Sequence, residues 1–227
     1  MPVIDNTHRL IGVVTQTDLV KAHVTNYQKG DSLKDQNRKL NRLSIGDPLT
    51  GLPNRRAMEI DIKRTAAVSK RQSLPYSIAL IDIDYFKSYN DGDGHQAGDE
   101  ALIFIADKLC NNLRSLDKIF RYGGEEFLFL MPMTPLERAQ IATRRIFDAI
   151  VHEKYPLQSS DLGFLNVSIG VASSFSENWV LVVEQADLAL YDAKADGQNR
   201  ISSAEPPSES EFWDFSRQID EGQPSVN

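Results

Sequence analysis

The chain has 227 residues, of which 41% are hydrophobic and 25% are charged, and these proportions predict a globular protein with a real core. A net charge of −7 and a pI of about 5.1 argue against broad nucleic-acid binding, which needs a basic surface. No apolar run reaches the length of a membrane span, no signal-peptide pattern is present, and the single cysteine, Cys110, excludes an internal disulfide. We therefore expect a cytoplasmic protein without membrane insertion.

The first part of the chain, residues 1–22, predicts a strand over residues 10–14 and a short helix that begins at Thr17 and Asp18. One strand and one helix cannot bury a core by themselves, so this piece is expected to be the end of a longer domain. Through residues 3–5 and 12–19 it resembles the closing strand and helix of a CBS module, a nucleotide-sensing repeat.

Residues 23–46 are polar, with Leu33, Leu40 and Leu43 at heptad-like spacing. This spacing predicts a short amphipathic linker helix that pairs with a second chain as a coiled coil. A solvated linker helix explains the pattern equally well, because one or two heptads are short for a coiled coil.

A turn-rich segment covers residues 47–54, and Asn54 is expected to cap the helix that follows. The apolar positions of this helix are Met58, Ile60, Ile62 and Val68. Residues 77–83 form a nearly continuous apolar run, typical of a strand covered on both faces. Helical spacing then predicts a helix over residues 97–113, in which Cys110 is expected to be a buried, inert thiol.

Two aromatic-rich flanks around Gly123 and Gly124 predict a tight β-hairpin, in which the glycines supply φ > 0 at both central turn positions. Pro135 is expected to open the next helix. The apolar positions of that helix are Ile141, Ala142, Ile146 and Ile150.

The remaining elements are a strand over residues 164–172, a helix over residues 180–195 and a last strand over residues 200–202. Residues 203–227 are rich in Pro, Ser and acidic residues, so we expect an acidic, mostly disordered tail. Within it, the aromatic residues 212–215 are expected to dock on the domain or on a neighbouring chain.

This order of elements predicts the fold class. Strand, helix, hairpin, helix and strand, with a further helix before and after, make a split βαββαβ arrangement of the α+β class. We expect a ferredoxin-like domain, with an antiparallel central sheet and flanking helices.

Paired acids mark the expected chemical site. Glu125 and Glu126 follow the hairpin turn directly, where adjacent carboxylates repel unless a cation lies between them. Asp82 and Asp84 end the apolar strand on one face, and burying them is costly unless they are paired or metal-bound. In the expected fold Asp82 and Glu125 converge on one cation or a cation pair. The alternative is an ordinary hairpin with two solvated acids.

Lysines and polar residues near these acids in the sequence suggest that the site binds a nucleotide. Lys87 and Lys194 are candidate phosphate ligands, although most lysines are solvated surface charges. Asn90 and Asp99 bracket a glycine-rich loop over residues 91–95, and an amide with a carboxylate can read the edge of guanine. A simple turn or a calcium loop is the alternative for residues 91–94, but the EF-hand spacing is not met.

Several separated motifs in this order resemble the GGDEF family, the diguanylate cyclases, over residues 47–202. They are Gly123-Gly124-Glu125-Glu126-Phe127, the segment 47–56, Asp82 to Lys87, Asn90-Asp91, Gly94-His95 with Gly98-Asp99, and Ala189 to Lys194. The resemblance implies that two GTP molecules are joined into cyclic di-GMP with release of two pyrophosphates. It also implies a transient homodimer in which each subunit holds one GTP.

The resemblance also implies roles for single residues. Asp82 and Glu125 would bind Mg²⁺, which Mn²⁺ can replace, with the Ile83 carbonyl helping and Glu126 nearby. Asn90 and Asp99 would recognise guanine. The groups expected to hold the triphosphate are Lys87, Lys194 and the backbone near Phe86, with Gly123 and Gly124 leaving room for the substrate.

An inhibitory site is implied by Arg114 and Asp117, which have the spacing of the family's RxxD motif. Bound cyclic di-GMP would inhibit the enzyme there, with Arg144 or Arg145 completing the site. A salt bridge at a helix end is the alternative. One departure from the family is Gln198, where an arginine is usual; Arg200 is the candidate to replace it.

Two other functions stay open from the sequence. One is a catalytically silent module that binds GTP or cyclic di-GMP, and the other is a cyclase of mixed nucleotides. Intact Asp82, Glu125 and Glu126 argue against the first, and Asp99 argues for guanine against the second.

Overall fold

The structure, a computed structural model, describes residues 2–4, 9–13, 45–156 and 163–204. The chain divides into two compact units, Met1–Ser44 and Ile45–Asn227. In the first unit, strand β1 (Pro2–Ile4) pairs antiparallel with strand β2 (Leu10–Val13). The predicted strand over residues 10–14 is therefore present.

Three predictions fall on other parts of the chain. The helix expected from Thr17, the linker helix as far as residue 44, and the tail from residue 205 with its aromatic residues lie outside the described residues. In the part that the structure describes, no helix has both the length and the apolar character needed to cross a membrane.

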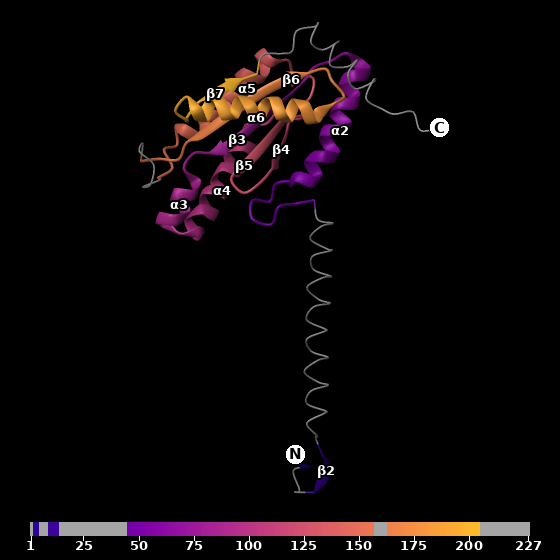
Figure 1. Cartoon of the computed structure of the whole chain (residues 1–227), viewed down its shortest axis with the longest axis vertical. Helices are drawn as coiled ribbons and strands as arrows, with labels where there is room; N and C mark the ends of the chain where they lie inside the picture. Colours follow the sequence, from indigo (N-terminus) through magenta and orange to yellow (C-terminus); the bar gives the residue numbers. More distant parts are fainter. Residues whose placement is uncertain (1, 5–8, 14–44, 157–162, 205–227) are drawn as a thin grey trace, which may run out of the picture. The chain divides into compact units, whose positions relative to one another are not determined.

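The second unit contains a five-stranded sheet in the order β4-β5-β3-β6-β7 with helices on both faces (Figure 1). Its strands are β3 (Tyr76–Ile83), β4 (Lys118–Arg121), β5 (Glu126–Met131), β6 (Val167–Ser174) and β7 (Ile201–Ser203). Its helices are α2 (Arg55–Gln72), α3 (Phe86–Asp93), α4 (His95–Cys110), α5 (Leu136–Val151) and α6 (Trp179–Ala195). The predicted α+β fold is confirmed. The sheet is mixed, because β7 pairs parallel with β6 while the other pairings are antiparallel.

Strand β3 lies at the centre of this sheet, and all eight of its residues are buried. Ala79, Ile81 and Ile83 pack in one core cluster with residues of α3, α4 and α5. Residues of the opposite parity, such as Leu80, pack in a second cluster with residues of α2 and α6. Because side chains alternate along a strand, Asp82 belongs to the face covered by α2 and α6.

Asn54 caps α2 as predicted, but two of the apolar residues named for the helices face solvent. The side chain of Asn54 accepts hydrogen bonds from the backbone N–H groups of Arg56 and Ala57, at 3.0 and 3.2 Å, as expected of an N-cap. Ile60 is 42% exposed, because it lies about half a turn away from the inward-facing Met58. Ile141 of α5 is likewise exposed.

The predicted burial of Cys110 is also wrong. This residue ends α4 and is exposed. Its neighbour Leu109 points into the core, so Cys110 lies about 100° further around the helix and faces solvent. Burial of part of the side chain raises the pKa of its thiol, helped by the charge of Asp107, which disfavours the reactive thiolate.

Candidate functional site

Asp82 lies at the end of β3, directly opposite Glu126 in the antiparallel pairing of β3 with β5. It is 7% exposed, and its Oδ1 atom is 2.8 Å from Nζ of Lys194 in the last turn of α6. The structure thus brings together three elements that are distant in the chain. Glu126, rather than Glu125, is the residue that faces Asp82 across the two strands.

The electrostatics of this place favour a bound cation. The pKa of Asp82 is raised to about 6, chiefly by burial; Lys194 acts to lower it, and the charges of Glu125 and Glu126 contribute to the rise. Burial likewise raises the pKa of Glu126, with Lys194 lowering it and Glu125 raising it. Three carboxylates that repel one another share a single lysine, which neutralises only part of their negative charge. An added cation would therefore stabilise them.

The carboxylates of the site fit a Mg²⁺ ion that also takes ligands from the substrate. Within the described ranges, no group of three or more His, Cys, Asp or Glu side chains is arranged to hold a metal ion by itself. Mg²⁺ usually binds through one or two carboxylates together with substrate phosphates and keeps several waters. The oxygens of Asp82 and Glu125 fit that shared mode of binding, in which the substrate completes the coordination.

The turn between β4 and β5, residues 122–125, is called the signature loop below. The predicted hairpin is confirmed, since Lys118–Arg121 pairs antiparallel with the following strand. The predicted tight turn is wrong, because neither Gly123 nor Gly124 is among the described residues with positive φ. Instead, the N–H groups of Tyr122 and Gly123 both donate to the carbonyl of Glu126, at 2.9 and 3.3 Å.

The two glycines contribute space rather than unusual backbone angles. A Cβ atom on Gly123 would lie 2.8 Å from Oε2 of Glu126, so a larger residue would displace this carboxylate. A Cβ on Gly124 would meet nothing within 4 Å, which leaves the outer side of the loop open to a ligand.

Asp84 differs from Asp82 in its surroundings. It is 1% exposed and accepts hydrogen bonds from Oγ of Ser168, at 2.8 Å, and from the backbone N–H of Asn199, at 2.9 Å. Burial raises its pKa, and these two hydrogen bonds and the charge of Lys194 oppose that rise. Asp84 therefore anchors the turn after α6, where Gln198 and Asn199 both have positive φ, at 61° and 50°.

The two candidate guanine-binding residues are brought together by a close helix contact. Asn90 is in α3, and Asp99 is exposed in the first half of α4. A Cβ atom on Gly98 would lie 1.9 Å from Oδ1 of Asn90, so only glycine allows the amide to lie against α4. This contact places Asn90 beside the helix that carries Asp99.

The loop predicted over residues 91–95 is wrong. Residues 91–93 form the last turn of α3, and α4 begins directly after Gly94, which has a φ of 88°. Packing of Phe86 and Tyr89 against the core stabilises this short helix in spite of its glycine.

Lys87 lies in the first turn of α3 and is exposed. Among the polar contacts of the described residues, none joins Lys87 to Asp82, Glu125 or Glu126. Its charge therefore stays available to a ligand. Ile83 and Phe86, by contrast, are buried, so they can offer only backbone atoms to a ligand.

The RxxD residues form the turn between α4 and β4. Oδ2 of Asp117 accepts a hydrogen bond from the backbone N–H of Arg114, at 3.0 Å, which leaves the exposed guanidinium outside this turn. Nη2 of Arg145 donates to the carbonyl of Asn112 in the same turn, at 2.6 Å. Arg144 instead lies over the ring of Phe147, at 5.2 Å. Of the two candidates, Arg145 is the one that reaches the turn.

Four residues of the site received no role from the sequence. Ser168 and Asn199 fix Asp84, and Asp47 and Arg121 join the start of the domain to the signature loop. Asp47 and Arg121 both belong to turn-like motifs, but no local pattern relates two residues so far apart. Only their meeting in the folded chain identifies them.

Comparison with known proteins gives a consistent result. A family model described as "Diguanylate cyclase, GGDEF domain" matches residues 44–200. Diguanylate cyclase DgcP of Pseudomonas aeruginosa is 39% identical over 173 residues, which are 76% of this chain and 25% of DgcP. The probable diguanylate cyclase DgcC of Escherichia coli is 36% identical over 183 residues, 78% of this chain and 48% of DgcC. The chain thus spans less than half the length of these curated relatives.

A solved structure agrees with this match. The coiled coil and GGDEF domain of DgcB from Caulobacter crescentus, in complex with c-di-GMP, has a TM-score of 0.65 at 28% identity, over 82% of this chain and 99% of that one. The family match does not reach residues 1–43, so the resemblance of residues 1–22 to a CBS module gains no support from these comparisons.

Proposed function

Because the chain belongs to the GGDEF family of diguanylate cyclases, we propose that it condenses two GTP molecules into cyclic di-GMP and releases two pyrophosphates. The observation that carries the proposal is the convergence of Asp82, Glu126 and Lys194 beside Glu125. DgcB, one of the structural neighbours, was solved as its coiled coil and GGDEF domain in complex with c-di-GMP.

In this proposal the side chains of the site bind the metal ion and the phosphates of GTP. Asp82 and Glu125 hold Mg²⁺, or Mn²⁺ in its place, with the Ile83 carbonyl and Glu126 close by. The bound cation would neutralise phosphate charge and ease ionisation of the attacking 3′-hydroxyl. Lys194, which pairs with Asp82 at 2.8 Å, is placed to exchange that carboxylate for a phosphate oxygen of GTP. Lys87 adds a second positive charge, beside the backbone at Phe86.

The base and the second substrate complete the proposal. Asn90 and Asp99 recognise guanine, since a carboxylate accepts hydrogen bonds from its N1–H and exocyclic amine. The reaction needs two GTP molecules facing each other, so two chains, each holding one GTP, would form the active homodimer. Gly124 leaves the loop side of the site open for that second nucleotide.

Purified protein incubated with GTP and Mg²⁺ is expected to produce cyclic di-GMP. Its specific activity should rise with protein concentration over a dilution series, since two half-sites must meet. ATP as a competitor should have little effect, and EDTA should stop the reaction. A protein that binds cyclic di-GMP in calorimetry but yields no product at any concentration would instead be a silent binding module.

Product inhibition is the second part of the proposal, with cyclic di-GMP bound by Arg114, Asp117 and Arg145. Arg145→Ala is expected to raise the inhibition constant for cyclic di-GMP about 10- to 100-fold, because a hydrogen bond to a charged group contributes about 1.5–3 kcal/mol. Arg144→Ala is the matched control, since Arg144 lies over Phe147. Relief of inhibition by Arg144→Ala alone would assign the role to the other arginine.

The upstream residues would regulate the domain. Residues 1–22 would belong to a CBS-like sensor, and the linker helix over residues 23–46 would set the geometry of the dimer. Deletion of residues 1–46 is then expected to change the protein concentration at which activity is half-maximal. An unchanged activity curve for the shortened chain would contradict this role.

A further inference from the structure

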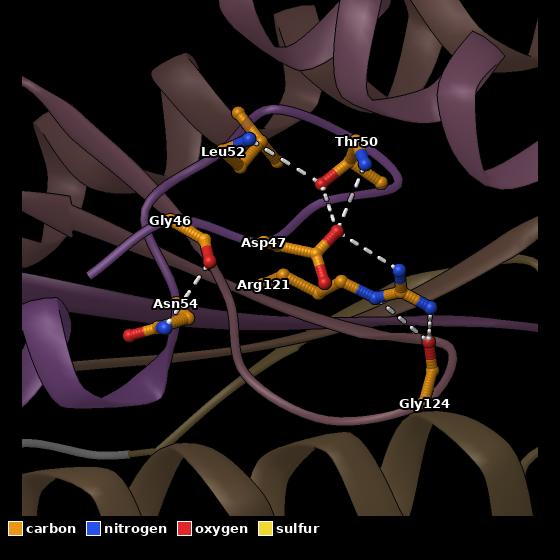
Figure 2. Close-up of polar contacts among 7 residues, drawn as sticks. All are labelled: Gly46, Asp47, Thr50, Leu52, Asn54, Arg121 and Gly124. Atoms are coloured by element: carbon orange, nitrogen blue, oxygen red, sulfur yellow. Dashed lines mark hydrogen bonds and ion pairs between the residues drawn. The ribbon is translucent and has the colours of Figure 1, made fainter. Parts of the chain in front are cut away.

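Arg121 connects the first residues of the domain to the signature loop (Figure 2). Its Nη1 atom donates to Oδ2 of Asp47 at 3.0 Å, while Nε and Nη2 donate to the carbonyl of Gly124 at 3.2 and 2.8 Å. Its side chain is only 15% exposed. A planar guanidinium with donors on two edges suits such a double contact, whereas a lysine has a single charged nitrogen.

The Asp47 end of this connection is itself fixed. Oδ2 of Asp47 also accepts from the backbone N–H and the hydroxyl of Thr50, at 2.9 and 2.7 Å. Burial acts to raise the pKa of Asp47, but the hydrogen bonds from Thr50 and Arg121 outweigh it and lower the pKa. Asp47 is therefore ionised at neutral pH and remains a strong acceptor for Arg121.

The backbone of Arg121 is held by the same segment. Its N–H donates to the carbonyl of Pro53 at 2.9 Å, and Asn54 forms an isolated parallel bridge with Arg121. Asn54 in turn caps α2. Main chain and side chain of Arg121 are thus both anchored to residues 47–54, which makes this segment a rigid base for the loop.

The Gly124 end of the connection leads directly into Glu125. The carbonyl of Gly124 and the N–H of Glu125 belong to one planar peptide group, so orienting the carbonyl orients the plane that leads to Glu125. The loop glycines lack positive φ, so no special backbone conformation sets this plane. Two nitrogens of Arg121 donate hydrogen bonds to this carbonyl.

We propose that Arg121 is a positioning residue, which holds the carboxylate of Glu125 in place by gripping the Gly124 carbonyl from a base formed by Asp47. The inference rests on the proposed function, because it supplies a support for one of the proposed metal ligands. Residues that support metal ligands in this way usually change metal affinity or activity 10- to 100-fold when they are replaced. Asp47 also lies at the very start of the second unit, so the support begins where the upstream segment joins the domain.

The test compares Arg121→Lys with Arg138→Lys in the full chain. Arg138 is an exposed residue of α5 and serves as the matched control. Arg121→Lys keeps the charge opposite Asp47 but loses the fork on Gly124. It is expected to lower kcat about 10- to 100-fold and to raise the Mg²⁺ concentration for half-maximal activity by a similar factor. The KM for GTP should change by less than about 3-fold, since base recognition is left in place.

Amide hydrogen exchange gives a second measurement that does not depend on activity. The N–H groups of Tyr122 and Gly123 close the signature loop, and their exchange is expected to be faster in Arg121→Lys than in the wild type and in Arg138→Lys. Asp47→Asn, which keeps the shape of the acceptor without its charge, should show the same changes to a smaller extent. If Arg121→Lys folds poorly, Asp47→Asn is measured in its place.

The outcomes separate the two proposals. Unchanged exchange at Tyr122 and Gly123 overturns the positioning role, even if activity falls. Wild-type kcat and Mg²⁺ dependence in Arg121→Lys overturns it as well. If the wild type yields no cyclic di-GMP, the proposed function fails, but faster loop exchange in the variants still supports the grip of Arg121 on the loop.

Discussion

Replacing Asp82 with asparagine is expected to lower cyclase activity at least about 10³-fold without destabilising the protein. The variant removes the charge of a proposed metal ligand, and loss of metal stabilisation of the transition state costs several kcal/mol. The same substitution removes a buried carboxylate whose pKa is raised to about 6, chiefly by burial, so the neutral amide fits the folded metal-free chain at least as well. Cyclase activity should therefore fall, while the stability of the metal-free protein stays the same or rises.

The sign of the pH dependence follows from the raised pKa. In metal-free buffer, the contribution of Asp82 to stability is fully present below its unfolded pKa of 3.8 and is lost as the pH rises through about 6. Melting temperatures measured between pH 4 and 7 in EDTA should show this loss in the wild type and a weaker one in Asp82→Asn.

Glu184→Gln, at an exposed acid of the same α6 that carries Lys194, is the matched control for Asp82→Asn and should keep wild-type activity. Two results would count against the assignment. One is an Asp82→Asn protein with activity within about tenfold of the wild type. The other is a loss of activity accompanied by a clearly lower melting temperature, which would indicate a structural role instead.

Replacing Gly170 with alanine is expected to have the largest effect on stability. Gly170 lies in β6 where α6 crosses the sheet, and a Cβ atom there would lie 2.1 Å from the carbonyl oxygen of Ala186 and 2.2 Å from the backbone nitrogen of Leu190. These are backbone atoms of a packed helix, so no change of rotamer can relieve the overlap. Overpacking of this kind costs about 3 kcal/mol or more, which corresponds to a fall in melting temperature of roughly 6–12 °C.

Gly92→Ala is the control for this variant. Gly92 is in α3, and a Cβ there would meet nothing within 4 Å, so alanine should leave stability unchanged or raise it slightly. Thermal unfolding of the purified proteins makes the comparison, with the soluble fraction on expression as the readout if Gly170→Ala does not fold. A melting temperature of Gly170→Ala within about 2 °C of the wild type would show that α6 shifts freely on the sheet.

Local patterns predicted the elements well, because period and composition are properties of neighbouring residues. The apolar run over residues 77–83 gave a buried central strand, and Asn54 proved to be the cap of α2. The same kind of reasoning was wrong for Cys110, and Ile60, which also belongs to an apolar pattern, faces solvent as well. Which side of a helix is covered depends on what packs against it, and the pattern alone does not contain that information.

The signature loop shows a second kind of limit. Gly123 and Gly124 predicted a hairpin, which is present, and a positive-φ turn, which is not. Glycine is compatible with both unusual backbone angles and close approach of a side chain. Deciding between them required the position of the Glu126 carboxylate, which lies 2.8 Å from where a Cβ of Gly123 would be.

The sequence by itself determined the class of fold, the family, and the acids, lysines and amides that can serve a nucleotide, because each is written in residue type and short-range spacing. Only the tertiary structure decided which of these groups meet. It set Glu126 opposite Asp82, paired Lys194 with Asp82, and bonded the backbone of Asn199 to Asp84. It also brought Arg145, rather than Arg144, into contact with the RxxD turn. Strand register and helix packing are long-range outcomes of burying one shared core, so no segment carries them alone. The grip of Arg121 on Gly124 and Asp47 belongs to the same class of facts.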